Sequence, residues 1–579
     1  MSLRIIRRAL TCEAGALGDL HPVLHRVYSG RGVRAASELN SALDRLLPIG
    51  TLEGVTDAVT LLLKHRHAGR ILVVGDFDAD GATSTALMVR ALNGFGFASV
   101  DFLVPNRFEF GYGLTPEIVA HAASRSPTLI VTVDNGISSV AGVAAARAAG
   151  LDVLITDHHL AGAELPIANV VVNPNLPGSR FASRALAGVG VAFYVMAALQ
   201  KRLTEEGTLP ANAPGVAELL DLVALGTVAD VVPLDINNRV LVTQGMRRIR
   251  AGRCVPGIRA LLEVAKRVGG DLAASDLAFA VAPRLNAAGR IDDMTVGIKC
   301  LLADDPATAT ALAARLDELN QERRTIEARM QIDALAAVRR LRDPQGPNAV
   351  HRQGVCLFDE SWHQGVVGLV ASRVKDRVRR PVIAFALGGE GTLRGSARSV
   401  TGIHIRDVLD AIAARHPDLI SKFGGHAMAA GLTLERDKLD RFARAFDEEV
   451  TRLSDPARGA DCIETDGELT VQEIALDTAG ALRNAGPWGQ AFPEPSFDGL
   501  FTIRNTRVVG TRHLKMWVEV PRTGRTFDAI AFNFIDEAES FVPPEGSARL
   551  VYRLDVNEYQ GERRLQLLVD HVLPAEAAG

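Results

Sequence analysis

The segment Ile71-Leu-Val-Val-Gly-Asp76-Phe-Asp78-Ala-Asp80-Gly81 organises the rest of the chain. Its apolar run has the length of a buried β-strand, and the three carboxylates after it precede a helix-like stretch at 82–92. Carboxylates this close repel one another and raise each other's pKa, so a multivalent cation would stabilise them. The alternative is a solvated acidic turn with an aspartate helix cap. On its own, the segment favours a metal site only slightly.

Two further strand-like runs end in polar residues. Leu129–Val133 is followed by Asp134-Asn135-Gly136, and Asp152–Thr156 is followed by Asp157-His158-His159. We expect all three motifs at the carboxyl edge of a parallel sheet, where open α/β folds place their sites. A fourth carboxylate, Asp230, follows the apolar segment 219–228. Carboxylates mixed with imidazole suit two Mn²⁺ or Mg²⁺ ions better than a thiolate-rich zinc site.

In this order the four motifs resemble those of the DHH phosphoesterase superfamily, and within it the branch of bacterial single-strand-specific 5′→3′ DNA exonucleases. The resemblance extends over residues 71–573. It implies an α/β protein with a doubly wound parallel-sheet DHH catalytic domain, a long connecting helix, a second α/β DHH-associated domain and a C-terminal OB-like β-barrel. It also implies an enzyme that degrades single-stranded DNA to mononucleotides by two-metal phosphodiester hydrolysis, in DNA repair and recombination.

The resemblance further assigns roles to individual residues. The metal ligands would be Asp78, Asp80, Asp134, His158 and Asp230, with Asp134 bridging the two ions. His159 would contact the scissile phosphate. Asp76 and Asp157 would either bind metal or orient the ligands, and we favour the orienting role for Asp157. Because imidazole joins the carboxylates, Mn²⁺ is the preferred ion and Mg²⁺ the alternative.

Two Arg-containing segments are candidates for binding phosphate. The loop 105–113 contains Arg107 and Tyr112, and the segment 283–290 contains Arg284, Asn286 and Arg290 among small residues. A surface turn with a packed Tyr and a capped surface helix are the respective alternatives. The resemblance favours contacts to the 5′ phosphate, without choosing between Arg284 and Arg290. Such an anchor would set the polarity of digestion, and a channel too narrow for a duplex would select single strands.

Residues 350–455 supply a second set of candidate DNA contacts. A helix is predicted to open near 366 and to carry Ser372 and Arg373, whose side chains suit phosphate. Polar, Gly-containing loops follow, and Gly-Gly beside a His could be only a strand–helix turn. The resemblance favours phosphate binding at the DHH-associated motif that faces the metal site. The candidate residues in these loops are Arg398, Gly424, Gly425 and His426.

The expected domain organisation has five parts: a lead-in at 1–45, the catalytic domain at 46–304, the connecting helix at 305–345, the DHH-associated domain at 346–455 and the barrel at 460–575. A long helix is predicted at 306–341, where Ala, Leu, Glu and Arg recur without Gly or Pro. Five short β-rich runs after 498 predict the barrel. There His513, Lys515 and Trp517 could stack and steer DNA, although a lone strand Trp is usually a core residue.

Composition limits the other possibilities. With 579 residues and 47 % hydrophobic content the chain has ample material for several cores, and a net charge of −4 argues against a uniformly basic coat. The five cysteines show neither metal spacing nor a disulfide framework, and neither a signal peptide nor a membrane-spanning run is evident. We therefore expect a cytoplasmic protein with no membrane partner.

Single-stranded DNA with a 5′ end is the expected partner. A helicase and a single-stranded-DNA-binding protein are natural additional partners, since something must expose and hold the strand, and the channel requires only a monomer. Two alternatives remain from the residues. One is a DHH phosphodiesterase acting on short oligonucleotides or small nucleotides, and the other is a non-catalytic DNA-binding scaffold.

Overall fold

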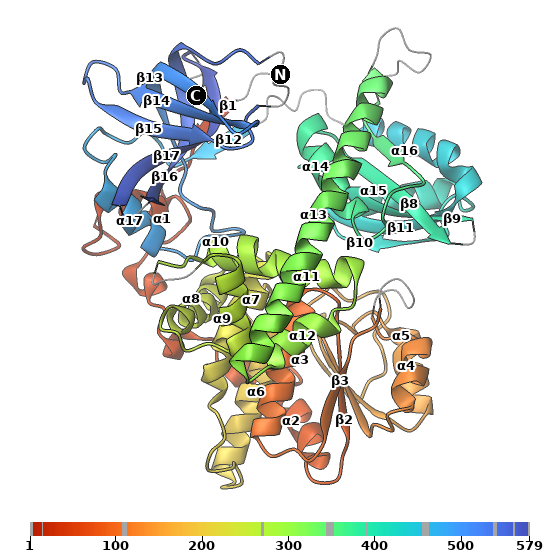
Figure 1. Ribbon diagram of the computed structural model, residues 1–579. Helices are drawn as coiled ribbons and strands as arrows, with labels where there is room; N and C mark the ends of the chain where they lie inside the picture. Colours follow the sequence, from red (N-terminus) through yellow and green to blue (C-terminus); the bar gives the residue numbers. More distant parts are fainter. Residues whose placement is uncertain are drawn as a thin grey trace. The chain divides into compact units, whose positions relative to one another are not determined.

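The computed structural model describes residues 4–13, 15–106, 113–267, 271–342, 352–389, 391–453, 462–535, 541–559 and 562–576 (Figure 1). The chain divides into two compact units. The first comprises Met1–Gly289, Asp293–Ala314 and Ala460–Gly579, and the second comprises Arg290–Asp292 and Arg315–Gly459.

A five-stranded parallel sheet forms the centre of the catalytic region in the first unit. In spatial order its strands are β3 (Val100–Leu103), β2 (Ile71–Gly75), β4 (Leu129–Val133), β5 (Asp152–Thr156) and β6 (Val170–Val172). Every residue of β2, β4 and β5 is buried, as a sheet covered on both faces requires. The predicted strands are therefore confirmed.

Helices cover both faces of this sheet, which confirms the doubly wound arrangement. α4 (Pro116–Ala123) and α5 (Val140–Ala148) lie on one side, and α2 (Val55–Lys64), α3 (Ala79–Gly94) and α6 (Gly188–Glu205) lie on the other (Figure 1). On the first side, Leu72 and Ile130 pack with Ile118 and Val143 in one apolar cluster. The helices that follow are α7 (Leu220–Ala229), α8 (Ile236–Arg250), α9 (Pro256–Val264), α10 (Ala274–Asp276), the π-helical turn η5 (Leu277–Val281), α11 (Ala282–Ile291) and α12 (Thr295–Leu302).

Short 3₁₀ segments occupy several of the connections in the chain. They are η1 (Ala36–Leu39), η2 (Leu43–Arg45), η3 (Ile49–Thr51), η4 (Val216–Leu219) and η6 (Arg436–Lys438). Among the described residues no single helix is both long and apolar enough to cross a membrane; the pair Leu43–Thr51 and Val55–Lys64, bent by 77°, meets that test only jointly.

The helix α13 (Pro306–Arg342) leads from the first unit into the second and has 37 residues. At about 1.5 Å per residue it is roughly 55 Å long. Ala, Leu, Glu and Arg favour helix, and Pro306 stands at the first helical position, where proline is tolerated. The predicted connecting helix is confirmed.

The second unit is built on a mixed five-stranded sheet. Its order is β10 (Lys422–Gly425), β11 (Ala429–Glu435), β9 (Thr392–Arg398), β8 (Val382–Gly389) and β7 (Val355–Phe358), and only β7 and β8 pair in parallel. The apolar side chains of α15 (Ile405–Arg415) and α16 (Leu439–Leu453) form one cluster with the sheet, and those of α13 and α14 (Val367–Val378) form another. The expected second α/β domain is present.

A closed five-stranded barrel completes the first unit. Its strands, in order around the barrel, are β13 (Phe497–Val509), β14 (His513–Glu519), β15 (Thr526–Ala531), β17 (Glu562–Pro574) and β16 (Gly546–Tyr559). The barrel prediction is confirmed. The expectation that Trp517 is a core residue is wrong, because the strand alternates and it is Leu514, Met516 and Val518 that point inward. Trp517 lies half-buried on the outer side.

The N-terminal lead-in, which the sequence left without a role, belongs to the barrel region. β1 (Arg4–Arg7) pairs in parallel with β12 (Cys462–Thr465), and α1 (Pro22–Ser29) places Val23 and Val27 in the barrel core together with Leu482 of α17 (Leu476–Asn484). The buried Asp498 accepts hydrogen bonds from Thr465 (2.7 Å), Arg7 (2.9 Å) and Arg549 (2.7 Å). One carboxylate therefore joins the chain's beginning to the barrel.

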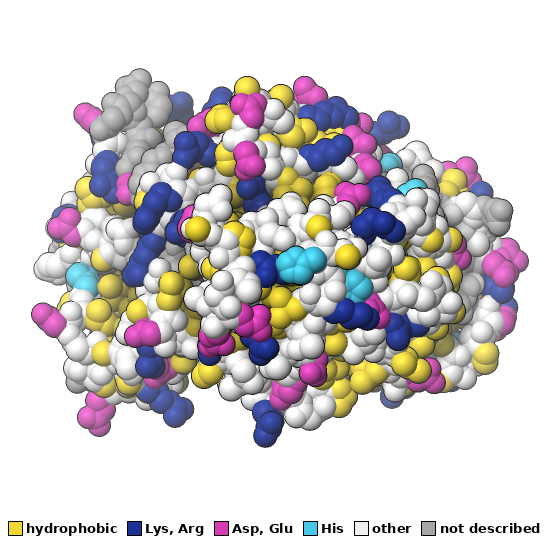
Figure 2. Space-filling view, turned by 90° about the horizontal axis from the view of Figure 1, so that it is seen from below, with side chains coloured by type: hydrophobic (Ala, Val, Ile, Leu, Met, Phe, Trp, Pro, Cys, Tyr) yellow, Lys and Arg dark blue, Asp and Glu magenta, His cyan; other side chains and the backbone are white. Residues whose placement is uncertain are grey.

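Charged side chains of both signs are interspersed on the surface. Figure 2 shows a face on which Lys and Arg alternate with Asp and Glu. This mixture agrees with the net charge of −4.

Replacing Asp498 with Ala should lower the free energy of unfolding by about 3 kcal/mol, because two arginines and a buried hydroxyl lose their common acceptor. Urea denaturation measures this loss. The matched control is Glu519→Ala on the same barrel. Its partner Arg504 has a side chain that is 57 % exposed, so this variant should lose less than about 1 kcal/mol of unfolding free energy. Equal losses for the two variants would contradict the assignment of Asp498 as the joining group.

Candidate metal centre

The register of the parallel sheet brings three acidic motifs to one point. Gly75, the last residue of β2, is aligned with Val133 of β4, and Val133 is aligned with Thr156 of β5. The next residue in each strand is an aspartate: Asp76, Asp134 and Asp157. All three are buried, so the sequence pattern becomes a row of carboxyl groups along the carboxyl edge of the sheet.

The first motif is held by its own backbone. Asp76 accepts a hydrogen bond from the Phe77 N–H (2.7 Å), and Asp78 caps α3 by accepting from the Gly81 N–H (2.9 Å). A Cβ at Gly81 would lie 2.6 Å from the Asp76 carbonyl oxygen, so the turn requires glycine. As a result Asp76, Asp78 and Asp134 each present an oxygen within 4.8 Å of the others.

Asp134 occupies a left-handed backbone conformation with φ 60°, which aspartate tolerates better than most residues. The amide of Asn135 fixes this turn by donating to the carbonyls of Val74 (3.0 Å) and Val133 (2.9 Å). Gly188 at the start of α6 lies against Asp134, where a Cβ would come within 2.6 Å of the Asp134 Cβ. The Asp-Asn-Gly motif thus serves to direct one carboxylate inward.

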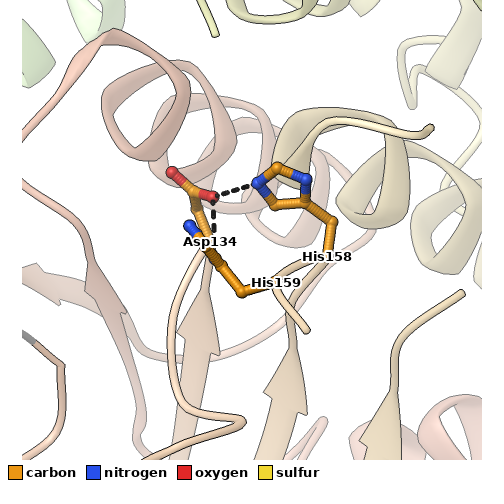
Figure 3. A group of neighbouring side chains, drawn as sticks. All are labelled: Asp134, His158 and His159. Carbon is orange, nitrogen blue, oxygen red and sulfur yellow. Dashed lines mark ion pairs between the residues drawn. The ribbon is translucent and has the colours of Figure 1, made fainter. Parts of the chain in front are cut away.

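His158 and His159 approach Asp134 from the end of β5 (Figure 3). The distance from His158 Nε2 is 3.1 Å to Asp134 Oδ1, 3.5 Å to Asp230 Oδ2 and 4.0 Å to Asp80 Oδ2. His159 Nδ1 lies 2.8 Å from Asp157 Oδ1 and 4.0 Å from Asp134 Oδ1. His158 therefore faces the carboxylates directly, whereas Asp157 orients His159.

Asp80 is held by the N-terminus of α6, a contact that the sequence did not reveal. The Gly188 N–H donates to one oxygen of Asp80 (2.6 Å) and the Val189 N–H to the other (3.0 Å). These two N–H groups belong to the unsatisfied first turn of the helix, where the helix dipole also favours a negative charge. The sequence of residues 187–190 predicts only a helix entry or a close packing site.

Asp230 caps the end of α7, and the residue after it is strained. Val231 has φ 61°, a left-handed conformation that β-branched residues rarely adopt, and it is 62 % exposed. Strain of this kind persists only when the surroundings enforce it, and it clusters at functional sites. The strained residue adjoins Asp230, whose Oδ2 lies 3.5 Å from His158 Nε2.

Burial and mutual repulsion disturb the ionisation of these carboxyl groups. Burial first, and then the charge of Asp78, raises the pKa of Asp80 to about 7. Burial and the neighbouring aspartates also raise the pKa values of Asp134 and Asp230 well above their ordinary range. Carboxyl groups with raised pKa values bind protons readily, unless a metal cation takes the place of those protons.

Asp157 and His159 behave in the opposite way. Burial would raise the pKa of Asp157, but its hydrogen bond to His159 and the charge of that ring outweigh burial and lower it. Burial lowers the pKa of His159, but Asp157, with the charges of Asp230 and Asp76, outweighs burial and raises the pKa to about 9. The two side chains therefore form an ion pair at neutral pH.

The donor set fits divalent metal ions. Three overlapping groups offer ligand atoms within 4.8 Å of one another: Asp76, Asp78 and Asp134; Asp134, His158 and His159; and Asp80, His158 and Asp230. A site made mostly of carboxylate oxygens, with one or two histidine ligands, suits Mn²⁺ and Mg²⁺. The predicted ligands are thus brought together, whereas the role of each stays a prediction.

The small residues of α11 lie against the turn that carries Asp76 and Asp78. A Cβ at Gly289 would lie 1.7 Å from the Phe77 carbonyl oxygen, and Asn286 Oδ1 accepts from the Ala79 N–H (2.8 Å). The close approach is therefore to the metal-binding turn, with Asn286 supporting that turn. Arg284 donates to the Ala280 carbonyl (2.5 Å) and Arg290 to the Gly365 carbonyl (3.4 Å). Arg107 and Tyr112 lie outside the described residues.

In the second unit the candidate phosphate ligands occupy separate elements. Ser372 and Arg373 lie on α14, where Glu327 of α13 approaches Arg373 Nε to 3.3 Å. Arg398 at the end of β9 donates to the Ser396 hydroxyl (3.0 Å), close to Gly368. Gly424 and Gly425 end β10, and the His426 N–H donates to the Ala429 carbonyl (2.8 Å). Their contacts with DNA stay predictions.

On the barrel, His513 and Lys515 share the outer side of β14 with Trp517. Lys515 Nζ lies 5.3 Å from the centre of the Trp517 ring and 3.2 Å from an Asp528 oxygen, and His513 meets the exposed Phe532 edge-on at 5.3 Å. This surface combines a lysine and an imidazole with aromatic rings, and single-stranded nucleic acids bind surfaces that offer positive charge beside aromatic rings.

Three family models match the chain: the DHH family N-terminal domain at residues 70–227, the DHHA1 domain at 350–452 and the RecJ OB domain at 465–571. The single-stranded-DNA-specific exonuclease RecJ of Escherichia coli (strain K12) is 52 % identical over 578 residues, which is 99 % of each chain. The protein of the same name from Haemophilus influenzae is 48 % identical over 96 % of this chain and 97 % of its own length.

This chain is also similar to solved structures. RecJ from Thermus thermophilus in complex with Mn²⁺ matches with a TM-score of 0.81 and 30 % identity, covering 100 % of this chain and 80 % of that one. Its complex with Mg²⁺ matches with a TM-score of 0.75 and 29 % identity, covering 99 % and 79 %.

The substitution Asp134→Asn should have opposite effects on stability with and without metal. In EDTA at about pH 8 the variant should melt at a higher temperature, because an uncharged amide replaces a buried carboxyl group whose ionisation burial and the neighbouring aspartates oppose. With Mn²⁺ present, its metal-induced rise in Tm should largely disappear. Asparagine keeps both the shape and the left-handed backbone.

The pH dependence follows from the raised pKa values. The pKa of Asp80 is about 7 in the folded protein, whereas the pKa of an aspartate in the unfolded chain is about 4. The free energy of unfolding of the metal-free protein should therefore fall as the pH rises from about 4 to about 7. Thermal melting in EDTA across this range measures the effect. A metal-free protein whose Asp134→Asn variant melts lower than wild type at pH 8 would contradict the repulsion argument.

Proposed function

This chain belongs to the RecJ family, and we propose that it hydrolyses single-stranded DNA from the 5′ end with two divalent ions bound at the Asp and His cluster. It is a single-stranded-DNA-specific exonuclease. The observation that carries the metal-dependent proposal is the cluster of carboxylates around His158, whose Nε2 lies 3.1 Å from Asp134 and 3.5 Å from Asp230. Two ions are proposed because Asp134 belongs to two adjoining groups of ligands, as a bridging carboxylate would.

Divalent ions held there lower the pKa of water and stabilise the oxygens that are exchanged at phosphorus. The chain's own residues determine where this happens. Asp80 is fixed by two backbone N–H groups and His158 by its carboxylate neighbours, so the ligands are set before an ion arrives. Mn²⁺ is the proposed ion, with Mg²⁺ as a substitute, because imidazole is part of the set.

His159 is proposed to bind the scissile phosphate. Asp157 accepts a hydrogen bond from the Nδ1 proton and holds the ring as a cation, which leaves the opposite nitrogen, Nε2, to donate to a phosphate oxygen. The partly exposed side chain of His159, at 30 %, is consistent with access to a ligand.

The 5′ preference is proposed to come from the arginine and serine candidates named from the sequence. Arg107, one of Arg284 and Arg290, and the pair Ser372 and Arg373 would hold the terminal phosphate. We also propose that the enzyme acts in the cytoplasm as a monomer, in DNA repair and recombination, and that a helicase and a single-stranded-DNA-binding protein supply its substrate.

Asp157→Asn should reduce the rate by about 10–100-fold, because His159 loses the carboxylate that keeps it charged. The alkaline limb of the pH–rate profile should also move to lower pH, since the pKa of His159 falls when its anionic partner is removed. Single-turnover digestion over a pH series in Mn²⁺ measures both. An unchanged alkaline limb would show that His159 does not act as the cation.

Digestion of a long single strand labelled at either end tests the function itself. We expect mononucleotides from the 5′ end only, no attack on blunt duplex, and complete loss with EDTA or Asp134→Ala. Mn²⁺ and Mg²⁺ are supplied separately, beside a short oligoribonucleotide and a cyclic dinucleotide. Cleavage of the small substrates alone would replace the exonuclease assignment with that of a small-nucleotide phosphodiesterase. Metal binding without any cleavage would favour a scaffold.

A further inference from the structure

A cavity of about 600 Å³ lies in the first unit at the end of α3 remote from the metal centre. Val89, Arg90 and Asn93 of α3 form one wall, and the end of α8 and the turn before α9 form another. Arg90 follows Asp80 by ten residues, so the two are separated by about 15 Å along the helix. The cavity is therefore distinct from the metal centre, although both lie along α3, which begins beside the candidate ligands Asp78 and Asp80.

Three arginines line the cavity: Arg90, Arg248 and Arg253. Arg90 is already occupied, because it pairs with Asp304 at 2.7 Å and donates to the Leu301 carbonyl at 3.0 Å. Arg248 has a buried Nε without a hydrogen-bond partner. Within the described part of the chain, neither Arg248 nor Arg253 makes a side-chain hydrogen bond or ion pair.

The acidic groups in and beneath the cavity wall already have partners. Glu218 accepts from the Gly215 N–H (3.2 Å) at the start of η4, and Asp304 pairs with Arg90. Asp221, fully buried beneath, accepts from the N–H groups of Val255 (2.7 Å) and Leu222 (2.9 Å). Asp221 thereby fixes the turn that carries Cys254 and Val255, so the wall is formed before a ligand arrives.

Much of the remaining lining is apolar. Val89, Pro214, Leu219 and Leu302 supply hydrocarbon surface beside the two arginines, and Asn93 adds an amide that can both donate and accept. A volume of this size is typical of small-molecule sites with a few fixed polar groups. The lining matches a ligand with an anionic end and a flat apolar part.

We propose that this cavity binds a nucleoside 5′-monophosphate, with its phosphate on Arg248 and Arg253 and its base on the apolar wall. Guanidinium groups bind phosphate through paired N–H donors. The choice of ligand rests on the proposed function, since a mononucleotide is the product that the exonuclease would release. The cavity would then sense product at the far end of α3.

Cys254 lines the cavity and provides a direct probe. The full-length protein in EDTA is treated with a maleimide at mildly alkaline pH, and the labelled peptides are quantified by mass spectrometry. Deoxyadenosine 5′-monophosphate at about ten times its Kd should slow labelling of Cys254 about tenfold. The exposed Cys462 should react at an unchanged rate. No DNA is turned over in EDTA, so the result is independent of whether the exonuclease assignment holds.

Arg248→Ala and Arg253→Ala should each remove the protection, and the surface variant Arg324→Ala should keep it. Thermal melting verifies that each variant is folded, and two cavity variants ensure that one failure to fold does not decide the outcome. Protection by inorganic phosphate or by deoxyadenosine alone, as strong as that by the nucleotide, would overturn the proposal. So would equal protection of Cys462, or protection that survives in both cavity variants.

Discussion

The structure depends on keeping several buried carboxylates within a few ångströms of one another. Asp80, Asp134 and Asp230 all have raised pKa values because they are buried together, and such a cluster destabilises the fold unless something neutralises it. Contacts within the first unit hold these carboxylates in place. The N-terminus of α6 holds Asp80, strand register aligns Asp76 with Asp134, and His158 lies between Asp134 and Asp230. A divalent cation completes the balance of charge.

The sequence was sufficient for features that depend on local pattern. The apolar runs of β2, β4 and β5 are fully buried, each ends at an acidic motif, and α13 follows from helix-forming residues without an internal break. The barrel strands were also found, because short β-rich runs separated by polar turns are a local pattern. The set of candidate ligands followed from the order of the four motifs, and the structure brings them together.

What the sequence could not provide depends on contacts between distant residues. Gly188 and Val189 reach Asp80 across more than one hundred positions, β1 pairs with β12 from the other end of the chain, and Gly289 packs on Phe77. None of these contacts has a local signature. Trp517 was misplaced for a different reason: the expectation weighed the residue type and not its position in β14, where it alternates with the inward Leu514, Met516 and Val518. The left-handed turn at Val231 is likewise visible only in the backbone.

The most direct test of this account is anomalous scattering from crystals grown with Mn²⁺. If the buried carboxylates form a two-metal centre, two anomalous peaks should appear about 3.5–4 Å apart. One should lie beside Asp76 and Asp78, the other beside Asp80 and Asp230, and Asp134 should lie between them. A single peak, or two peaks that do not share Asp134, would contradict the central claim that this carboxylate cluster is organised as a bridged metal pair.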